Sequence, residues 1–261
     1  MRSRSPAFAG TFYSDKPQEL AATVRSFVAE AVCAAPKPPK AVIAPHAGYI
    51  YSGPIAGTAY AALSARGKDI ERVILLGPSH RVAFDGVATS AAGAFETPLG
   101  PVNVDREAVI LLVKENLARE FDRAHENEHS LEVQLPFVKL VCPEARVVPI
   151  LAGDDDWQAA LKVLALLWGG DETAIVVSSD MSHYESYATA QRLDAATAKT
   201  VERLAAGEVG LEQACGATGI NALLALAGEK GLACTALDLR NSGDTAGPRD
   251  RVVGYGAFAA G

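Results

Sequence analysis

The chain has 261 residues, of which 49% are hydrophobic, and it carries a formal net charge of −7. This length is sufficient for a substantial core, and α/β proteins of this size commonly form one domain, so we expect a single domain over residues 1–261. The negative charge and the absence of a Lys/Arg stripe argue against nucleic acid or an anionic membrane as the main partner. We therefore expect a small molecule or another protein instead.

The N-terminal segment MRSRSPAFAGTFYSDK contains two arginines, but its apolar stretch is short and interrupted, unlike that of a secretory signal. No run approaches the roughly 18 apolar residues that a membrane span needs. The four cysteines are widely spaced and form no C-x-x-C pair; they are Cys33, Cys142, Cys215 and Cys234. This pattern is typical of a reducing compartment, so we expect a cytoplasmic protein with mostly buried thiols.

Short apolar runs rich in β-branched residues alternate with segments of helical periodicity along the chain. This order predicts a three-layer α/β domain, in which helices cover both faces of a central, mostly parallel (mixed) sheet. Strands are expected at 40–45, 72–78, 146–152, 173–179, 232–240 and 251–259. Helices are expected at 54–66, 105–118, 129–141, 156–168, 188–206 and 216–230. The Gly/Pro-rich segment 86–104 predicts a hairpin excursion.

Three of the expected strands end in polar residues that can bind a metal ion. The run AVIAP leads to His46, the run LLGPS leads to His80, and the run VVSSD ends at Asp180 with His183 shortly after it. The two strands that precede the first two histidines are about one βαβ unit apart, which places them side by side or one strand apart. Because open α/β sheets bind ligands at the carboxyl ends of their strands, these imidazoles can share one ion.

Each of these residues also has an ordinary structural interpretation. A single histidine after a strand is most often a loop residue or a hydrogen-bonded core group. Asp180 can cap the segment that follows it, and His183 can simply be exposed. Because two histidines follow strands in similar Pro-containing turns, we weigh a shared metal site equally with these structural interpretations.

Residues 125–129, HENEH, match the zinc-protease pattern H-E-x-x-H, whose two histidines lie one helical turn apart on the metal. The surrounding residues are polar on all sides, and helical apolar spacing begins only at Leu131. We therefore expect no zinc-protease helix here. Instead, His129 and Glu132 are expected to form a polar lid at the start of a helix, and Glu126 is expected to face solvent.

Seven motifs taken together resemble the Memo family, called AmmeMemoRadiSam system protein B in prokaryotes. In chain order they are RSPAFAGTFY, PHAGYIYSG, LLGPSH, ETPLGPVNVD, EHSLEVQLPF, SSDMSH and NSGD. The family shares its fold with class III extradiol dioxygenases, which are non-haem iron enzymes that open catechol-type rings with O₂. The resemblance therefore implies a class III extradiol dioxygenase-like fold and an Fe(II) ion, with zinc or copper as alternatives. It also implies a radical-SAM protein and an AMMECR-type protein as candidate partners.

By position, the resemblance makes His46 and His80 the histidine ligands and places Asp180 and His183 beside the metal. His183, oriented by Asp180, would take the acid/base role that a histidine has in the dioxygenases. Extradiol enzymes use a glutamate as the third ligand, and some Memo proteins use a cysteine of a late loop, which here reads RNSGDTAG without a cysteine. Asp244 in this loop is therefore the expected third ligand, with a turn-forming role as the alternative.

The remaining site residues are expected to contact the substrate. Tyr49 and Tyr51 in the PHAGYIY turn can line the pocket by stacking or hydrogen bonding, or alternatively can pack in the core. His129, in the expected lid, is the third such residue.

From these residues we expect a metal-binding protein that acts as a non-haem iron oxidoreductase or dioxygenase-like enzyme on a small molecule. Because a shared fold does not fix the chemistry, two alternatives stay open. One is a non-catalytic, metal- or redox-dependent interaction protein of the AmmeMemoRadiSam system. The other is a zinc hydrolase.

Overall fold

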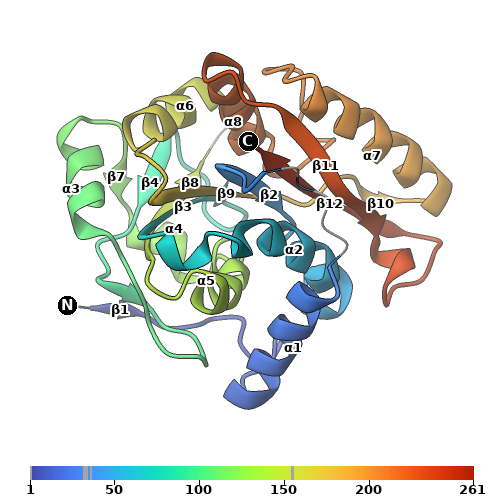
Figure 1. Cartoon of the computed structure of the whole chain (residues 1–261), viewed down its shortest axis with the longest axis horizontal. Helices are drawn as coiled ribbons and strands as arrows, with labels where there is room; N and C mark the ends of the chain where they lie inside the picture. The colour runs from blue at the N-terminus through green and yellow to red at the C-terminus, as the bar shows by residue number, and fades with distance from the viewer. Residues whose placement is uncertain (1, 32–34, 36, 154–155) are drawn as a thin grey trace.

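Four parallel strands form the centre of the fold (Figure 1). The structure is a computed structural model, and it describes residues 2–31, 35, 37–153 and 156–261. In sheet order the central strands are β2 (Ala41–Ala44), β9 (Thr173–Ser178), β3 (Arg72–Pro78) and β8 (Arg146–Ala152). They consist almost entirely of buried residues, as strands covered on both faces do. All four strands were expected from their apolar runs, and their observed positions confirm that prediction.

Antiparallel strands extend the sheet on both sides of this centre. On one side β12 (Val252–Ala260) pairs with β2, and it also pairs with β10 (His183–Glu185) and β11 (Cys234–Asn241). On the other side β4 (Val87–Thr89) pairs with β8 and with β7 (Arg119–Glu120). The sheet of the described residues is thus mixed, with a parallel centre and antiparallel flanks, which confirms the expected α/β class.

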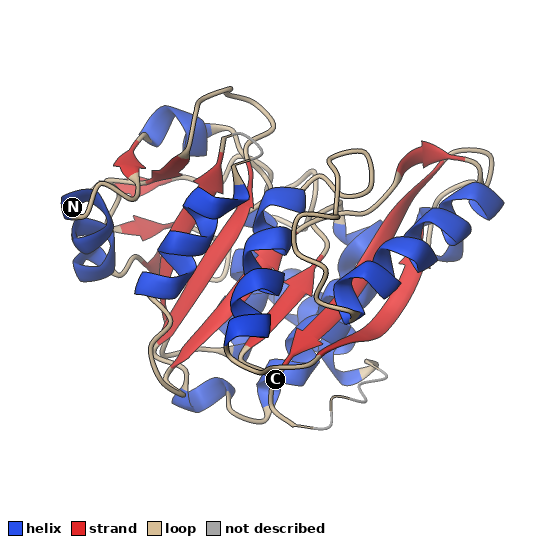
Figure 2. Cartoon of the chain, turned by 90° about the horizontal axis from the view of Figure 1, so that it is seen from above, coloured by secondary structure: helices blue, strands red, loops and turns tan. Residues whose placement is uncertain are grey.

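Helices cover both faces of the sheet, as Figure 2 shows. On one face α2 (Tyr49–Ser64) packs with α1 (Pro17–Ala29) and α5 (Leu135–Val141). On the other face α8 (Ala217–Glu229) contacts β3 and β9 and packs with α6 (Trp157–Leu166). The further helices are α3 (Arg106–Lys114), α4 (Asp122–Glu126) and α7 (Tyr187–Glu202), the last of which packs on β11 and β12. Among the described residues, no helix is both long and apolar enough to cross a membrane.

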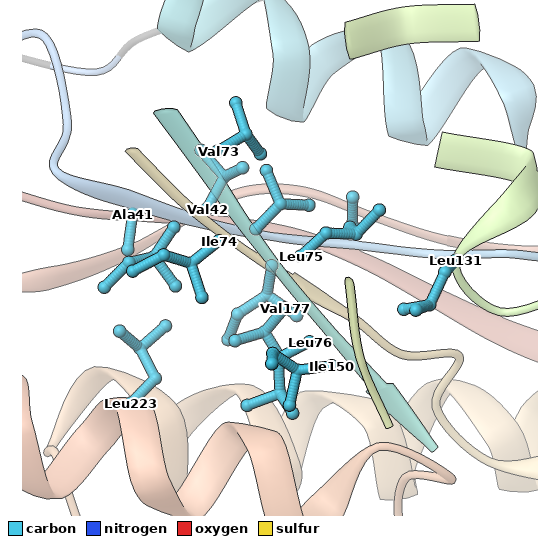
Figure 3. Close-up of a cluster of buried hydrophobic side chains, with 14 of the residues drawn as sticks. Ala41, Val42, Val73, Ile74, Leu75, Leu76, Leu131, Ile150, Val177 and Leu223 are labelled. Carbon is cyan, nitrogen blue, oxygen red and sulfur yellow. The ribbon is translucent and has the colours of Figure 1, made fainter. Parts of the chain in front are cut away.

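The buried core lies between these layers. Figure 3 shows Val73 on one side of β3 and Leu76 on the other, where Leu223 of α8 lies. All three side chains are fully buried. Burial of each such side chain contributes about 1.5–3 kcal/mol, so the parallel centre is the best stabilised part of the sheet.

All six expected helices are present, but α2 begins at Tyr49 instead of residue 54. Pro54 was taken as the start, whereas it lies inside the helix. The first turn is instead fixed by tertiary contact, because the Tyr49 N–H donates to the Phe12 carbonyl at 2.8 Å. Helix α1 was missed, although Pro17 at its start and buried Leu20 and Val24 are typical of an amphipathic helix.

The expected hairpin within 86–104 is formed by β5 (Ala94–Phe95) and β6 (Val102–Asn103), which pair antiparallel. The strand β1 (Ser3–Arg4) pairs with β5 and completes a small second sheet. The N-terminal segment therefore lies next to a part of the chain about ninety residues further on, as the register Ser3 to Ala94 records.

Glu132 anchors this N-terminal segment from inside the protein. Its fully buried carboxylate pairs with Arg4 and accepts hydrogen bonds from the Ala7 N–H (2.9 Å), the Phe8 N–H (2.8 Å) and the Tyr13 hydroxyl (2.7 Å). The expectation that Glu132 belongs to a polar lid is therefore wrong. A charged side chain can be buried when it is paired and hydrogen-bonded, and all of its partners here are more than one hundred residues away in sequence.

We expect Arg4→Met to destabilise the protein by about 3 kcal/mol, because removing one partner of a buried pair leaves an uncompensated charge. Urea denaturation of both proteins measures this difference. Arg2→Met is the matched control, since Arg2 is exposed and surface substitutions usually change stability by only ~0.5 kcal/mol. Equal stability of the Arg4 variant and the wild type would contradict this role of the pair.

Candidate metal centre and adjoining cavity

His46 and His80 meet where the central strands end. His46 follows β2 and His80 follows β3, and β9 lies between these two strands. The two imidazole centroids are 5.2 Å apart, with the rings nearly perpendicular at 77°. The histidines therefore converge as the strand spacing predicted.

The hydrogen bonds of His46 fix which ring nitrogen carries its proton. Its Nδ1 lies 2.9 Å from the hydroxyl oxygen of Ser178, the last residue of β9. That hydroxyl donates its only proton to the Ser130 carbonyl at 2.6 Å, so it accepts from Nδ1–H. Burial, with the neighbouring histidines, lowers the pKa of His46 well below its usual value, so the ring is neutral. Its Nε2 therefore presents a lone pair, which is the form that binds a metal.

His80 is oriented in the same way by a carboxylate. Its Nδ1 lies 2.9 Å from Glu128 Oε1, and its backbone N–H donates to Oε2 of the same residue at 2.6 Å. Burial tends to raise the pKa of Glu128, but the His80 contacts and the Ser130 N–H outweigh it and lower this pKa to about 2. The ionised carboxylate only accepts, so His80 donates from Nδ1 and keeps Nε2 available.

Cys215 supplies a third donor atom that the sequence did not point to. Its Sγ lies 3.2 Å from His46 Nε2, and the donor atoms of His46, His80 and Cys215 all lie within 4.8 Å of one another. Cys215 was expected only as one of several buried thiols. The signal available in the sequence was a Cys-Gly pair directly before a helix, since Gly216 is the N-cap of α8.

Gly216 explains how this thiol reaches the strand ends. A Cβ atom at this position would lie 2.6 Å from the Ser179 Cβ, so only glycine lets the start of α8 come so close to the end of β9. The Gly216 N–H donates to the Ser179 hydroxyl at 2.9 Å, and the Asp180 N–H contacts the Cys215 sulfur at 3.3 Å. Burial, together with the Asp180 charge, raises the pKa of the Cys215 thiol far above its usual range. A bound cation would therefore have to displace the thiol proton.

Asp244, the third ligand expected from the resemblance, does not join this group. Its Oδ1 accepts from the Tyr187 hydroxyl and its Oδ2 from the Asn241 N–H at 3.0 Å, as part of a capping box. It therefore has the turn-forming role that was its alternative. In the late loop, the Asp244 carboxylate caps the loop's own backbone. The third candidate donor is instead Cys215, in the segment before α8.

A second group of ligand-type residues shares His80 and comprises Glu128 and His129. Glu128 Oε1 lies 3.2 Å from His129 Nδ1, and the His80 and His129 rings stack at 4.6 Å between centroids. The Glu128 carboxylate is already engaged by His80 and by the Ser130 N–H at 2.9 Å. We therefore assign Glu128 to orienting His80 rather than to binding an ion itself.

Asp180 and His183 lie beside the three donors. Asp180 Oδ1 accepts from the His46 N–H at 2.7 Å, and its Oδ2 is 4.0 Å from His46 Nε2, so this carboxylate contacts His46 instead of orienting His183 as expected. Burial raises the pKa of Asp180 to about 7, against the opposing effect of the backbone N–H groups of His46 and Ala47. Burial also lowers the pKa of His183, which begins β10 and is half-buried. Asp180 can therefore exchange a proton near neutral pH, whereas His183 is shifted towards its neutral form, which can accept a proton.

A cavity of about 650 Å³ opens over these residues. Its lining includes His46, His80, Asp180 and His183, together with Tyr51 and His129 as expected for substrate contacts. Tyr49 does not line it. The Tyr49 ring is buried and its hydroxyl donates to the Val133 carbonyl at 2.7 Å, so the packing alternative holds for this residue.

The HENEH segment forms no zinc-protease helix, as expected. Helix α4 ends at Glu126, so His125 and His129 are not on one continuous helix. His125 is buried against Phe95, with 5.9 Å between ring centroids, whereas His129 lines the cavity and Glu126 is exposed. The two histidines therefore serve different parts of the structure.

The donor set fits a transition-metal ion. Two imidazoles, each held by a hydrogen bond at Nδ1, and one thiol form a compact set of N and S donors. Imidazole suits zinc, copper, iron and nickel, and thiolate suits softer ions among these. The chain thus presents three protein donors and an open side towards the cavity, as catalytic metal sites do.

Comparison with known proteins gives consistent matches over the whole chain. A family model described as Memo-like protein matches residues 4–259. A MEMO1 family protein of Methanopyrus kandleri is 36% identical, with 98% of each chain covered. A MEMO1 family protein of Aquifex aeolicus is 35% identical, also with 98% of each chain covered.

We expect Ser178→Ala to weaken metal binding about 10–100-fold, the usual effect of losing a group that orients a metal-binding histidine. Without the hydroxyl, His46 Nδ1 loses its acceptor and its tautomer is no longer fixed. Competition with a chromophoric chelator measures the affinity. Ser64→Ala is the control, since this exposed hydroxyl bonds only within α2. Unchanged affinity in the Ser178 variant would show that this bond does not prepare His46.

Proposed function

This chain belongs to the Memo family, and on that basis we propose that it is a metal-dependent oxidoreductase acting on a small molecule. The observation that carries the proposal is the convergence of three donor atoms, from His46, His80 and Cys215, within 4.8 Å of one another. Two of these donors, His46 and His80, lie in the wall of a cavity whose lining also includes Asp180 and His183, two groups able to accept or donate a proton. The combination favours chemistry over a purely structural ion.

Iron is the ion we propose first, on the resemblance to extradiol dioxygenases. Zinc and copper are the alternatives that the thiol donor supports, because thiolate ligands favour these softer ions. When bound, iron or copper would supply a centre that can hold a substrate oxygen and exchange electrons, whereas zinc would only polarise that oxygen. His46 and His80 would hold it through Nε2, and Cys215 through Sγ.

The other residues of the chain would position the substrate and move protons. His183 lies at the cavity wall, where it can take a proton from a substrate hydroxyl or return one. Asp180 is tied through Oδ1 to the His46 N–H, so it holds the turn that carries the first ligand in place. His129 and Tyr51 form part of the wall against which a planar substrate can pack.

We expect Cys215→Ser to lower metal affinity strongly and Asp244→Asn to leave it unchanged. The serine hydroxyl is a much weaker ligand than a thiolate for iron, copper or zinc, whereas the Asp244 carboxylate accepts from the Asn241 N–H and from the Tyr187 hydroxyl of α7 and is not grouped with the three candidate donors. Metal content after identical anaerobic reconstitution, measured by mass spectrometry, separates the two. If the Asp244 variant were empty and the Cys215 variant full, the third ligand would be the carboxylate.

We expect His183→Gln to retain the metal and lose turnover by about 10²–10⁴-fold, the usual contribution of a general acid/base group. Product formation with O₂ and a panel of aromatic diols measures turnover, and the metal content of the same sample serves as the internal control. Loss of the metal would make His183 a ligand. Full turnover with full metal content would remove it from the chemistry.

A further inference from the structure

The mouth of the cavity carries positive charge that is not neutralised by the protein. Arg81 directly follows His80, Arg251 directly precedes β12, and both exposed side chains line the cavity. Among the described residues, neither guanidinium has a carboxylate within the 4.0 Å of an ion pair. The cavity's one acidic lining residue, Asp180, is buried and bonded to the His46 N–H.

This charge is unusual for the chain as a whole. The protein has a net charge of −7, with 31 acidic residues against 24 basic ones. Two arginines without an ion-pair partner at one opening therefore create a local positive potential, opposite in sign to the net charge of the protein. A concave site lined by one sign of charge attracts ligands of the opposite sign.

Tyr184 adds an aromatic surface to the same opening. It lies in β10 at a register shift against β12 and has a backbone φ of 60°, a left-handed conformation that non-glycine residues rarely adopt. The exposed ring of Tyr184 at this register shift lines the cavity, and the Arg251 guanidinium lies 5.1 Å from the centroid of that ring. Strained residues of this kind concentrate at ligand-binding sites, where the structure holds them in place.

Further rings continue this surface towards the metal donors. Phe12 and Tyr51 line the cavity, and the Phe12 ring lies 5.0 Å from that of His129, which in turn stacks on His80. A planar ligand can therefore contact aromatic side chains along the cavity, whose lining also offers two exposed guanidinium groups. The volume of about 650 Å³ is in the usual range for small-molecule sites.

We propose that the cavity binds a small aromatic carboxylate, with its carboxylate group at Arg81 and Arg251 and its ring against Tyr184, Phe12 and Tyr51. The opposite end of the ligand then faces His46 and His80, the two candidate donors that line the cavity. This inference deepens the proposed function, on which it rests for the role of that inner end. Guanidinium groups are suited to carboxylates because their planar donors match both oxygens.

The test compares two probes that differ only in charge, 3,4-dihydroxybenzoate and 3,4-dihydroxybenzamide. Calorimetry under anaerobic conditions gives the affinity of each probe for the metal-reconstituted full chain. We expect the wild type to prefer the acid by about tenfold or more, since charge-assisted bonds are the stronger ones. Arg81→Gln and Arg251→Gln should each reduce this preference, and the double variant should abolish it without changing the affinity for the amide.

Arg249→Gln is the matched control. It lies two residues from Arg251, but its guanidinium packs on Tyr187 at 4.5 Å and its Nε donates to the Gly243 carbonyl at 3.3 Å, and it does not line the cavity. This variant should keep the full preference for the acid. A preference that disappeared equally in this control would point to general electrostatics and overturn the assignment.

Equal binding of both probes to the wild type, or binding of neither, would also overturn the proposal. The metal content of the same samples is measured separately. A wild-type protein that contains no metal after reconstitution would contradict the proposed function without deciding whether the arginines bind a carboxylate. In that case the acid–amide comparison still tests the two arginines, because none of their described contacts involves the metal donors. Retained preference in the double variant would place the anion elsewhere.

Discussion

The position of β9 between β2 and β3 is the constraint on which the site depends. Parallel strands end at the same edge of a sheet, so the residues that follow all three strands meet there. Ser178 and Asp180 at the end of the middle strand consequently contact His46 through its ring and its backbone N–H. Because the strands are buried on both faces, this geometry is held by the packed core of the sheet.

The outer wall of the site is held by a different kind of interaction. The ion pair between Arg4 and Glu132 fixes the N-terminal segment against the protein. This segment carries Phe8 and Phe12, whose ring centroids lie 5.4 and 5.0 Å from that of His129. Arg4 also donates to the Glu128 carbonyl at 2.9 Å, next to the carboxylate that orients His80. A buried charge network thus joins the N-terminal segment to the residues around the candidate metal donors.

The sequence was sufficient to predict the four parallel strands and the convergence of His46 and His80, because uninterrupted apolar runs and the Pro–His turns after them are local signals. It was not sufficient for Cys215 or Asp244. Whether a donor reaches the ion depends on how closely α8 approaches β9, which Gly216 permits, and on whether a carboxylate is used within its own loop. Glu132 was misplaced for the same reason, since its polarity suggested solvent while its partners lie at the other end of the chain.

The three candidate donors come from residues 46, 80 and 215, so they are brought together only when the sheet and α8 are assembled. An ion that binds all three therefore recognises the native state and has no equivalent site in the unfolded chain. By mass action, free metal at one hundred times its dissociation constant would stabilise such a protein by about 2.7 kcal/mol. The supply of metal would then change how strongly the folded chain resists unfolding, as well as how much of it is loaded.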